Sequence, residues 1–99
     1  MAEVRTAAAM NGEYVELAGV LVHARTHALD RVVRRIGLLP GAQVHATGPG
    51  GKLVVTLEAA SGRDVLARLE QLRDIAGVLS ASLVYEHTEP SHSEAGAES

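Results

Sequence analysis

The chain has 99 residues, which suffices for one domain with a hydrophobic core but not for two. It contains no cysteine, which excludes a disulfide framework and a thiolate metal site and fits a reducing compartment. It has no run of ~18 consecutive apolar residues, and its early apolar run, Ala7 to Met10, is too short for a signal-peptide core. We therefore expect a cytoplasmic domain that does not insert into a membrane.

The formal charge of −3 comes from the C-terminal end of the chain. Residues 88–99 hold three of the twelve acidic residues and none of the nine lysines and arginines, so residues 1–87 are neutral overall. This tail has no large apolar residue, so we expect it to be disordered, and we expect residues 1–14 to form a flexible lead. The folded domain is then residues 15–87. The neutral charge of residues 1–87 argues against nucleic-acid binding, which normally requires a basic face.

The first half of the domain predicts a strand followed by a helix. Residues 16–24, ELAGVLVHA, are rich in Val and Leu and are typical of a strand. Thr26 is a suitable helix cap, and apolar residues then recur at helical spacing, at Leu29, Val32, Val33 and Ile36. Gly37 or the Pro40-Gly41 pair ends this helix.

The second half predicts two strands, a helix and a final strand. A short strand over residues 42–46 and a longer one over residues 52–58 flank the glycine-rich turn TGPGG. Ser61 opens a helix with Asp64 in its first turn, where negative charge suits the helix dipole. The buried stripe of this helix consists of Val65, Leu69, Leu72 and Ile75 or Ala76. The fourth strand is GVLSASLVYEH, residues 77–87.

The resulting order, βαββαβ, predicts an α+β fold, the ferredoxin-like sandwich. Its four-stranded antiparallel sheet has the strand order 4-1-3-2. Both amphipathic helices cover one face of the sheet, because two helices suffice for only one side. The other face, which we name the open face, is left without a covering layer.

Strand alternation then assigns side chains to the two faces. The predicted helix-side residues are Ala18, Val20, Val22, Ala24, Leu53, Val55, Leu57, Leu79, Ala81, Leu83 and Tyr85. The predicted centre of the open face, which we name the platform, consists of Gly19, Leu21, Val54, Thr56, Ser80, Ser82 and Val84. The platform is small, smooth and partly apolar, as binding surfaces often are. Three interpretations stay open: a platform for a ligand or partner, closure by a second copy, and plain surface.

Residues for catalysis or metal binding are not grouped in the sequence. Of the five histidines, His23 and His27 span a strand-to-helix boundary, where their spacing does not converge on a metal. His45 and His87 belong to different strands, and His92 is in the tail. No paired general acid and base is evident. We therefore expect no enzyme activity, no cofactor and no metal.

Other functions of the ferredoxin-like fold can be tested by asking whether the sequence contains the residues that they require. A copper carrier needs a Cys-x-x-Cys loop, which is absent. An RNA-recognition domain needs aromatic residues on the open face, and the only aromatic residues are Tyr14 and Tyr85, the latter predicted to point inward. A regulatory domain that senses a small molecule, of the amino-acid-binding kind, and dimerises through its sheet is compatible with the sequence.

Four segments carry a resemblance to a known family. They are GVLVHAR in the first strand, LLPGAQVHA after the first helix, GKLVVTLEA in the third strand, and GVLSASLVYEH followed by an acidic tail. In order, length and spacing, the chain from Glu16 to His87 resembles the NapD family of cytoplasmic chaperones for the assembly of periplasmic nitrate reductase.

The resemblance implies a binding protein and not an enzyme. Such chaperones bind the twin-arginine (Tat) signal peptide of the catalytic subunit, delay its export until the molybdenum cofactor is inserted, and support its maturation. The resemblance places the peptide on the open face, so the seven platform residues become the predicted peptide-binding residues. A face that serves a partner also predicts a protein that is largely monomeric when free.

Three acidic residues are expected at one end of the platform. The first strand runs antiparallel to both the third and the fourth, so Glu58 and Glu86 near the ends of those strands lie beside Glu16. Lys52 and His23 fall at the opposite end. We expect the three carboxylates to face the paired arginines of the signal peptide, because guanidinium groups pair well with carboxylates.

Overall fold

The computed structural model describes residues 14–90 and confirms the predicted order of elements. The strands are β1 (Tyr14–Ala24), β2 (Ala42–Gly48), β3 (Lys52–Ala59) and β4 (Val78–Pro90). The helices are α2 (Leu29–Ile36) and α3 (Gly62–Arg73), and two short 3₁₀ turns are η1 (Thr26–Ala28) and η2 (Pro49–Gly51). Within this part of the chain, no helix has the length and hydrophobicity needed to cross a membrane.

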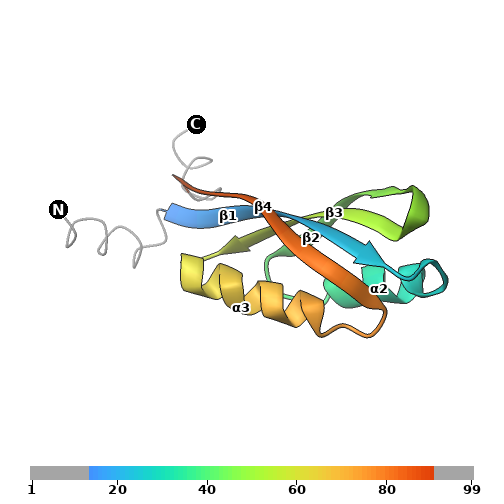
Figure 1. Cartoon of the computed structure of the whole chain (residues 1–99). Helices are drawn as coiled ribbons and strands as arrows, with labels where there is room; N and C mark the ends of the chain where they lie inside the picture. Colours follow the sequence, from blue (N-terminus) through green and yellow to red (C-terminus); the bar gives the residue numbers. More distant parts are fainter. Residues whose placement is uncertain (1–13, 91–99) are drawn as a thin grey trace.

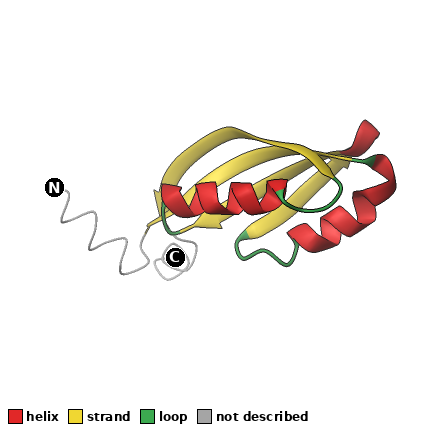
Figure 2. Ribbon diagram, turned by 60° about the horizontal axis from the view of Figure 1, so that its bottom comes forward, coloured by secondary structure: helices red, strands yellow, loops and turns green. Residues whose placement is uncertain are grey.

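The four strands form one antiparallel sheet in the order β2-β3-β1-β4, which is the predicted order viewed from the other edge. β1 and β3 are therefore central, and β2 and β4 are edge strands. Helices α2 and α3 both lie against the same side of the sheet (Figure 1 and Figure 2). The opposite side carries no layer from residues 14–90, as predicted for the open face.

The hydrophobic core lies between the sheet and the two helices. Alternate residues of the central strands point into it, and the apolar stripes of the helices meet them. Its buried members are Ala18, Val20, Val22, Ala24, Ala28, Val32, Ile36, Leu53, Val55, Leu57, Val65, Leu69, Leu72 and Ala81. The predicted helix side of β1 and β3 and the stripe of α3 are thus confirmed.

The two helices begin in different ways. The Ser61 hydroxyl accepts a hydrogen bond from the backbone N–H of Asp64 at 3.2 Å, which is the predicted cap of α3. The predicted cap of the first helix is wrong. Thr26 lies in the 3₁₀ turn η1, and α2 starts only at Leu29, with no side-chain hydrogen bond to its first turn. The 3₁₀ turn takes the place of a side-chain cap at this end.

Gly77, between α3 and β4, is a position that requires glycine. Its φ of +101° lies in a region that other residues rarely adopt. A methyl group at this position would also lie 2.7 Å from Cβ of Ala28. The Gly77 carbonyl accepts a hydrogen bond from the Arg25 N–H at 2.8 Å, which fixes the start of β4 against the end of β1.

Strand β4 is longer than the sequence suggested. It pairs with β1 as far as Tyr14 opposite Pro90, so residues 88–90, which were predicted to lie in the tail, continue the sheet. The remaining tail, residues 91–99, and the lead up to residue 13 lie outside the described residues, and with them the predictions that they are disordered or flexible.

Strand β4 also departs from regular alternation at Val84. Gly19 pairs with Tyr85 and Val20 pairs with Leu83, so Val84 is an extra residue, a β-bulge. Beyond the bulge the alternation reverses, and Tyr85 shares the open face with Gly19. The prediction that Leu79 and Tyr85 point into the core is wrong: they are 49% and 45% exposed. Leu83 pairs with Val20 on the helix side, as predicted, but is 37% exposed.

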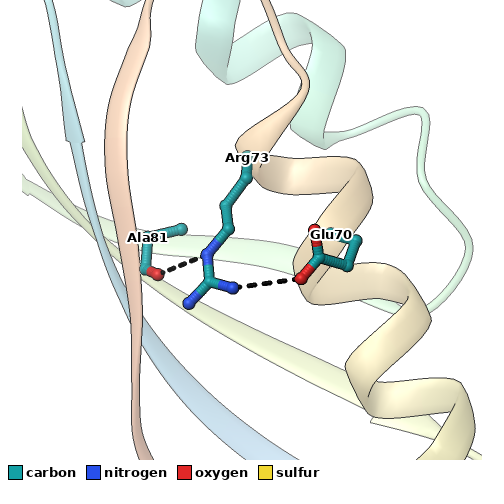
Figure 3. Close-up of polar contacts among 3 residues, drawn as sticks. All are labelled: Glu70, Arg73 and Ala81. Atoms are coloured by element: carbon teal, nitrogen blue, oxygen red, sulfur yellow. Dashed lines mark hydrogen bonds and ion pairs between the residues drawn. The ribbon is translucent and has the colours of Figure 1, made fainter.

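A polar contact ties helix α3 to the edge strand β4. The guanidinium Nε of Arg73 donates a hydrogen bond to the carbonyl of Ala81 at 3.0 Å, and Nη1 contacts Glu70 at 3.1 Å (Figure 3). Ala81 is also the β4 residue that lies buried in the core. This contact fixes the middle of β4 to the helix layer, while β1 pairs with β4 along its whole length.

Candidate functional site

The predicted platform residues of β1, β3 and β4 are brought together on the open face. Leu21 of β1 pairs with Val54 on one side and with Ser82 on the other. Gly19 of β1 pairs with Thr56 of β3. Ser80 pairs with His23 at the far end of the same face, and Val84 lies at the bulge. The register therefore brings Gly19, Leu21, Val54, Thr56, Ser80 and Ser82 together on one face, and Val84 adjoins them without a pairing partner.

The centre of this face is apolar and accessible. Leu21 is 40% exposed, Val54 48% and Val84 61%. They are joined by Tyr85, so four exposed apolar side chains lie on three neighbouring strands. None of the platform positions holds a charged residue. A contiguous exposed apolar surface of this kind is typical of an interaction site.

Gly19 has a different role from the expected one. It is buried although it belongs to the open face, because the Tyr85 ring covers it. A methyl group here would lie 2.6 Å from Cδ2 and 2.8 Å from Cζ of Tyr85, closer than atoms pack. Gly19 is small to admit this ring and is not itself open to a ligand.

Tyr85 is a site residue that the sequence analysis missed. Its ring stacks on His87, with 5.7 Å between ring centroids and 19° between ring planes. Nε2 of His87 lies 3.2 Å from Oε2 of Glu89, within hydrogen-bond distance. An aromatic pair backed by a carboxylate therefore borders one end of the platform. A one-residue bulge does not alter the composition of a strand, so the alternation of side chains alone could not have predicted that Tyr85 lies on the open face.

Two of the three predicted acids lie on the other side of the sheet. Glu86 pairs with Ala18, which is buried under the helices, and Glu16 accepts a hydrogen bond from the Thr88 hydroxyl. A methyl group at Gly62, the first residue of α3, would lie 3.1 Å from Glu86 Oε2 and 3.9 Å from Glu16 Oε2. The expectation that Glu16 and Glu86 border the open face is therefore wrong. Both stand at the positive end of the α3 dipole instead.

The two displaced acids interact with each other. The hydrogen bond that protonated Glu86 donates to the Glu16 carboxylate, some loss of hydration and the like charge of Glu16 raise the pKa of Glu86 above its ordinary value of 4.5. Both carboxyl groups lie on the helix side of the sheet and contribute no charge to the open face.

Glu58 keeps its predicted place. It pairs with Leu17, an open-face residue that also pairs with His87 on the opposite side. Glu89, which contacts His87, pairs with Val15 on the same face. The acidic end of the open face is thus formed by Glu58 and Glu89, one on each side of β1.

The opposite end of the open face is basic. Lys52 and His23 pair with each other there, and Nε2 of His23 lies 2.9 Å from the carbonyl oxygen of Gly50. His45, on β2, lies with Nε2 2.6 Å from the Thr56 hydroxyl. His23, His45 and His87 thus have separate partners, and residues 14–90 contain no group of three or more side chains suited to hold a metal ion.

Apart from the open face, a hollow lies in the helix layer. It has a volume of about 370 Å³ and is lined by Arg35, Leu38, Leu39, Gln71, Asp74 and Ile75. Leu38, at 75% exposed, is its most accessible apolar side chain. This groove carries charges of both signs and contains none of the predicted peptide-binding residues.

Fold and site together define a ferredoxin-like α+β domain whose uncovered sheet face offers a shallow apolar surface with one acidic and one basic end. A model of the family described as "NapD protein" matches residues 15–90. Because this match spans most of the chain, the protein belongs to the NapD family.

Individual relatives agree with this assignment. The protein named "Chaperone NapD" from Escherichia coli K12 is 28% identical over 75 residues, which cover 75% of this chain and 86% of the relative. That from Paracoccus pantotrophus is 32% identical over 77 residues, or 78% of this chain and 68% of the relative. The solution structure of the E. coli Tat proofreading chaperone protein NapD aligns with a TM-score of 0.69 at 28% identity, covering 76% of this chain and 80% of that one.

Proposed function

We propose that this protein is a cytoplasmic Tat proofreading chaperone that binds the signal peptide of the periplasmic nitrate reductase catalytic subunit. By holding that peptide, it delays export until the molybdenum cofactor is inserted and so supports maturation of the subunit. The observation that carries the proposal is the exposed apolar open face, with opposite charges at its two ends, in a member of the NapD family.

The open face matches the chemistry of such a peptide. A Tat signal peptide begins with a paired-arginine region and continues with an apolar stretch. The apolar stretch packs on Leu21, Val54 and Val84, where burial of apolar area supplies most of the affinity. The arginines lie toward Glu58 and Glu89, and exposed ion pairs of this kind contribute only about 0.2–1 kcal/mol each. The charges therefore set the direction of the peptide more than its affinity.

This function requires binding and no chemical step. A bound signal peptide is withheld from the export machinery for as long as the complex lasts. The fraction withheld follows the free chaperone concentration relative to the dissociation constant. Release then depends on any event that lowers affinity for the peptide or competes for it.

Calorimetric titration of the synthetic signal peptide into the protein tests the proposal directly. We expect saturable binding with a 1:1 stoichiometry and no turnover of the peptide. Absence of binding at high micromolar peptide concentration would rule out the proposed function.

A matched pair of variants tests the location. The double variant Leu21→Asp/Val84→Asp places two charges on the platform and should lose most of the peptide affinity at both low and high salt. The control is Leu66→Asp, which changes an equally accessible leucine (56% exposed) on α3. It should bind the peptide as the unaltered protein does, since it lies on the other side of the sheet.

The free protein is expected to be largely monomeric, because the open face is kept for the peptide. Light scattering over a dilution series measures this directly. A dimer that persists on dilution and dissociates when the peptide is added would mean that a second copy covers the open face in the absence of peptide.

A further inference from the structure

The bulge at Val84 creates a feature that regular alternation would not allow. It turns Tyr85, one of only two aromatic residues in the chain, onto the open face. Gly19 provides the space beneath the ring, so the sheet supports the ring, while Tyr85 as a whole remains 45% exposed. Tyr85 is thus a fixed aromatic surface at the edge of the platform.

The neighbouring residues extend this aromatic surface. The His87 ring stacks on the Tyr85 ring with 19° between the ring planes, so a second aromatic ring lies beside the first on the open face. Glu89 Oε2 lies 3.2 Å from the His87 ring at its far end. On the other side of Leu17, Glu58 supplies a second carboxylate to the same end of the face. We name Tyr85, His87 and Glu89 the aromatic seat.

The aromatic seat suits a particular side chain. A π surface attracts cations, and a planar, weakly hydrated guanidinium stacks on it better than a compact ammonium does. A carboxylate at the end of the stack provides the hydrogen-bond acceptors that a guanidinium needs. The apolar stem of an arginine can lie over Leu17, which is half-buried between the two sides. The opposite end of the open face, with Lys52 and His23, repels the same side chain.

We propose that the aromatic seat of Tyr85, His87 and Glu89 binds one arginine of the twin-arginine motif, with Tyr85 as the residue that distinguishes arginine from other side chains. This inference rests on the proposed function and deepens it, because it assigns the end of the open face that the arginine region occupies. The peptide then runs from the aromatic seat across Leu21 toward the Lys52 end.

A double-mutant cycle between protein and peptide tests the assignment. The protein variants are Tyr85→Leu, which keeps an apolar cover over Gly19, and Tyr85→Phe, which keeps the ring. The peptides carry the native arginine pair or have either arginine changed to Gln or to Lys. Each combination is measured by calorimetry, and circular dichroism verifies that each variant is folded.

The expected pattern follows from stacking on the ring. Tyr85→Leu should weaken binding of the native peptide about two- to tenfold, and Tyr85→Phe should stay within about twofold of the unaltered protein. For one of the two Arg→Gln peptides the effect of Tyr85→Leu should vanish, and the Lys peptide at the same position should recover only part of it. Tyr14→Leu is the matched control, since Tyr14 is 44% exposed but lies on the helix side of β1 by alternation.

Two results would overturn the inference while leaving the proposed function intact. If Tyr85→Leu binds the native peptide as tightly as the unaltered protein, the seat is not used. If Tyr85→Leu weakens the native and both Gln peptides equally, Tyr85 contacts the apolar stretch and not an arginine. A complete lack of binding by the unaltered protein would instead remove the proposed function, and this inference with it.

Discussion

The two faces of this sheet are built from the same strands and differ sharply in what their side chains do. On the helix side, Val22 and Leu53 are paired neighbours and are fully buried. On the open side, the next pair, Leu21 and Val54, is equally aliphatic but 40% and 48% exposed. Burial explains the first pair, since it removes apolar area from water. It does not explain the second pair, whose hydrophobicity fits the proposed peptide-binding face.

The largest expected effect is a difference in the free energy of unfolding between two variants, each with one leucine truncated on one face of the sheet. Leu53→Ala leaves a cavity in the core and should lower the free energy of unfolding by about 2–5 kcal/mol. Leu21→Ala should lower it by about 1 kcal/mol or less, because the side chain is already partly in water. Urea denaturation followed by circular dichroism measures both values.

Peptide affinity should show the opposite order for variants that remain folded. Leu21→Ala is expected to weaken binding of the signal peptide, whereas Leu53→Ala should bind normally in the fraction that is folded. Equal losses of stability in the two variants would contradict the division between a structural face and a binding face.

A middle-sized effect is expected where Tyr85 covers Gly19. Gly19→Ala pushes a methyl group into the Tyr85 ring and should destabilise the protein by about 1–3 kcal/mol, as overpacking commonly does. In a Tyr85→Ala background the same change meets no ring, and it should be neutral or slightly stabilising, because alanine is less costly than glycine in a strand. If Gly19→Ala costs the same in both backgrounds, the ring does not lie on Gly19.

A smaller effect distinguishes the acids of the two faces. Glu58→Gln removes a carboxylate from the open face and should weaken peptide binding by about 0.2–1 kcal/mol at low salt, with less effect at high salt. Glu86→Gln is the matched control, since its carboxylate stands at the start of α3 on the helix side. A stronger effect of Glu86→Gln than of Glu58→Gln would show that the arginine region binds elsewhere.

The smallest effect concerns the pair of acids on the helix side. The pKa of Glu86 is raised in the folded state, so the stability linked to this group is present below its ordinary value of 4.5 and is lost as pH rises through the higher folded value. Glu86→Gln keeps a hydrogen-bond donor toward Glu16 and carries no charge. The variant should therefore be slightly more stable than the unaltered protein at pH 7, and the difference should vanish below pH 4.5. Thermal melts across this range measure it, and a gain that grows toward acid pH would refute the explanation.

The regular parts of the molecule could be predicted from the sequence, and the assignments failed where strand β4 carries extra residues. The central strands alternate strictly, so the faces of Ala18, Leu21, Leu53 and Val54 followed from spacing alone. The bulge at Val84 shifts all later residues of β4 by one position, and a bulge depends on how two strands pair, not on local composition.

The extra residues in β4 explain three wrong predictions. Tyr85 was expected in the core and lies on the open face, and Glu86 was expected near the open face and lies on the helix side. Leu79 is a second extra residue, between the pairs Ala24 with Val78 and His23 with Ser80, and it is exposed for the same reason. The missing cap at Thr26 is independent, since a 3₁₀ turn replaced it.

The central claim is that the open face binds the signal peptide, and nuclear magnetic resonance tests it most directly. Amide and methyl signals of an isotope-labelled sample are followed while unlabelled peptide is added. The largest shifts are predicted at Leu21, Val54 and Ser82, with Val65 and Leu69 on α3 unchanged. Shifts confined to the helix-layer groove around Leu38, with the open face unchanged, would contradict the account.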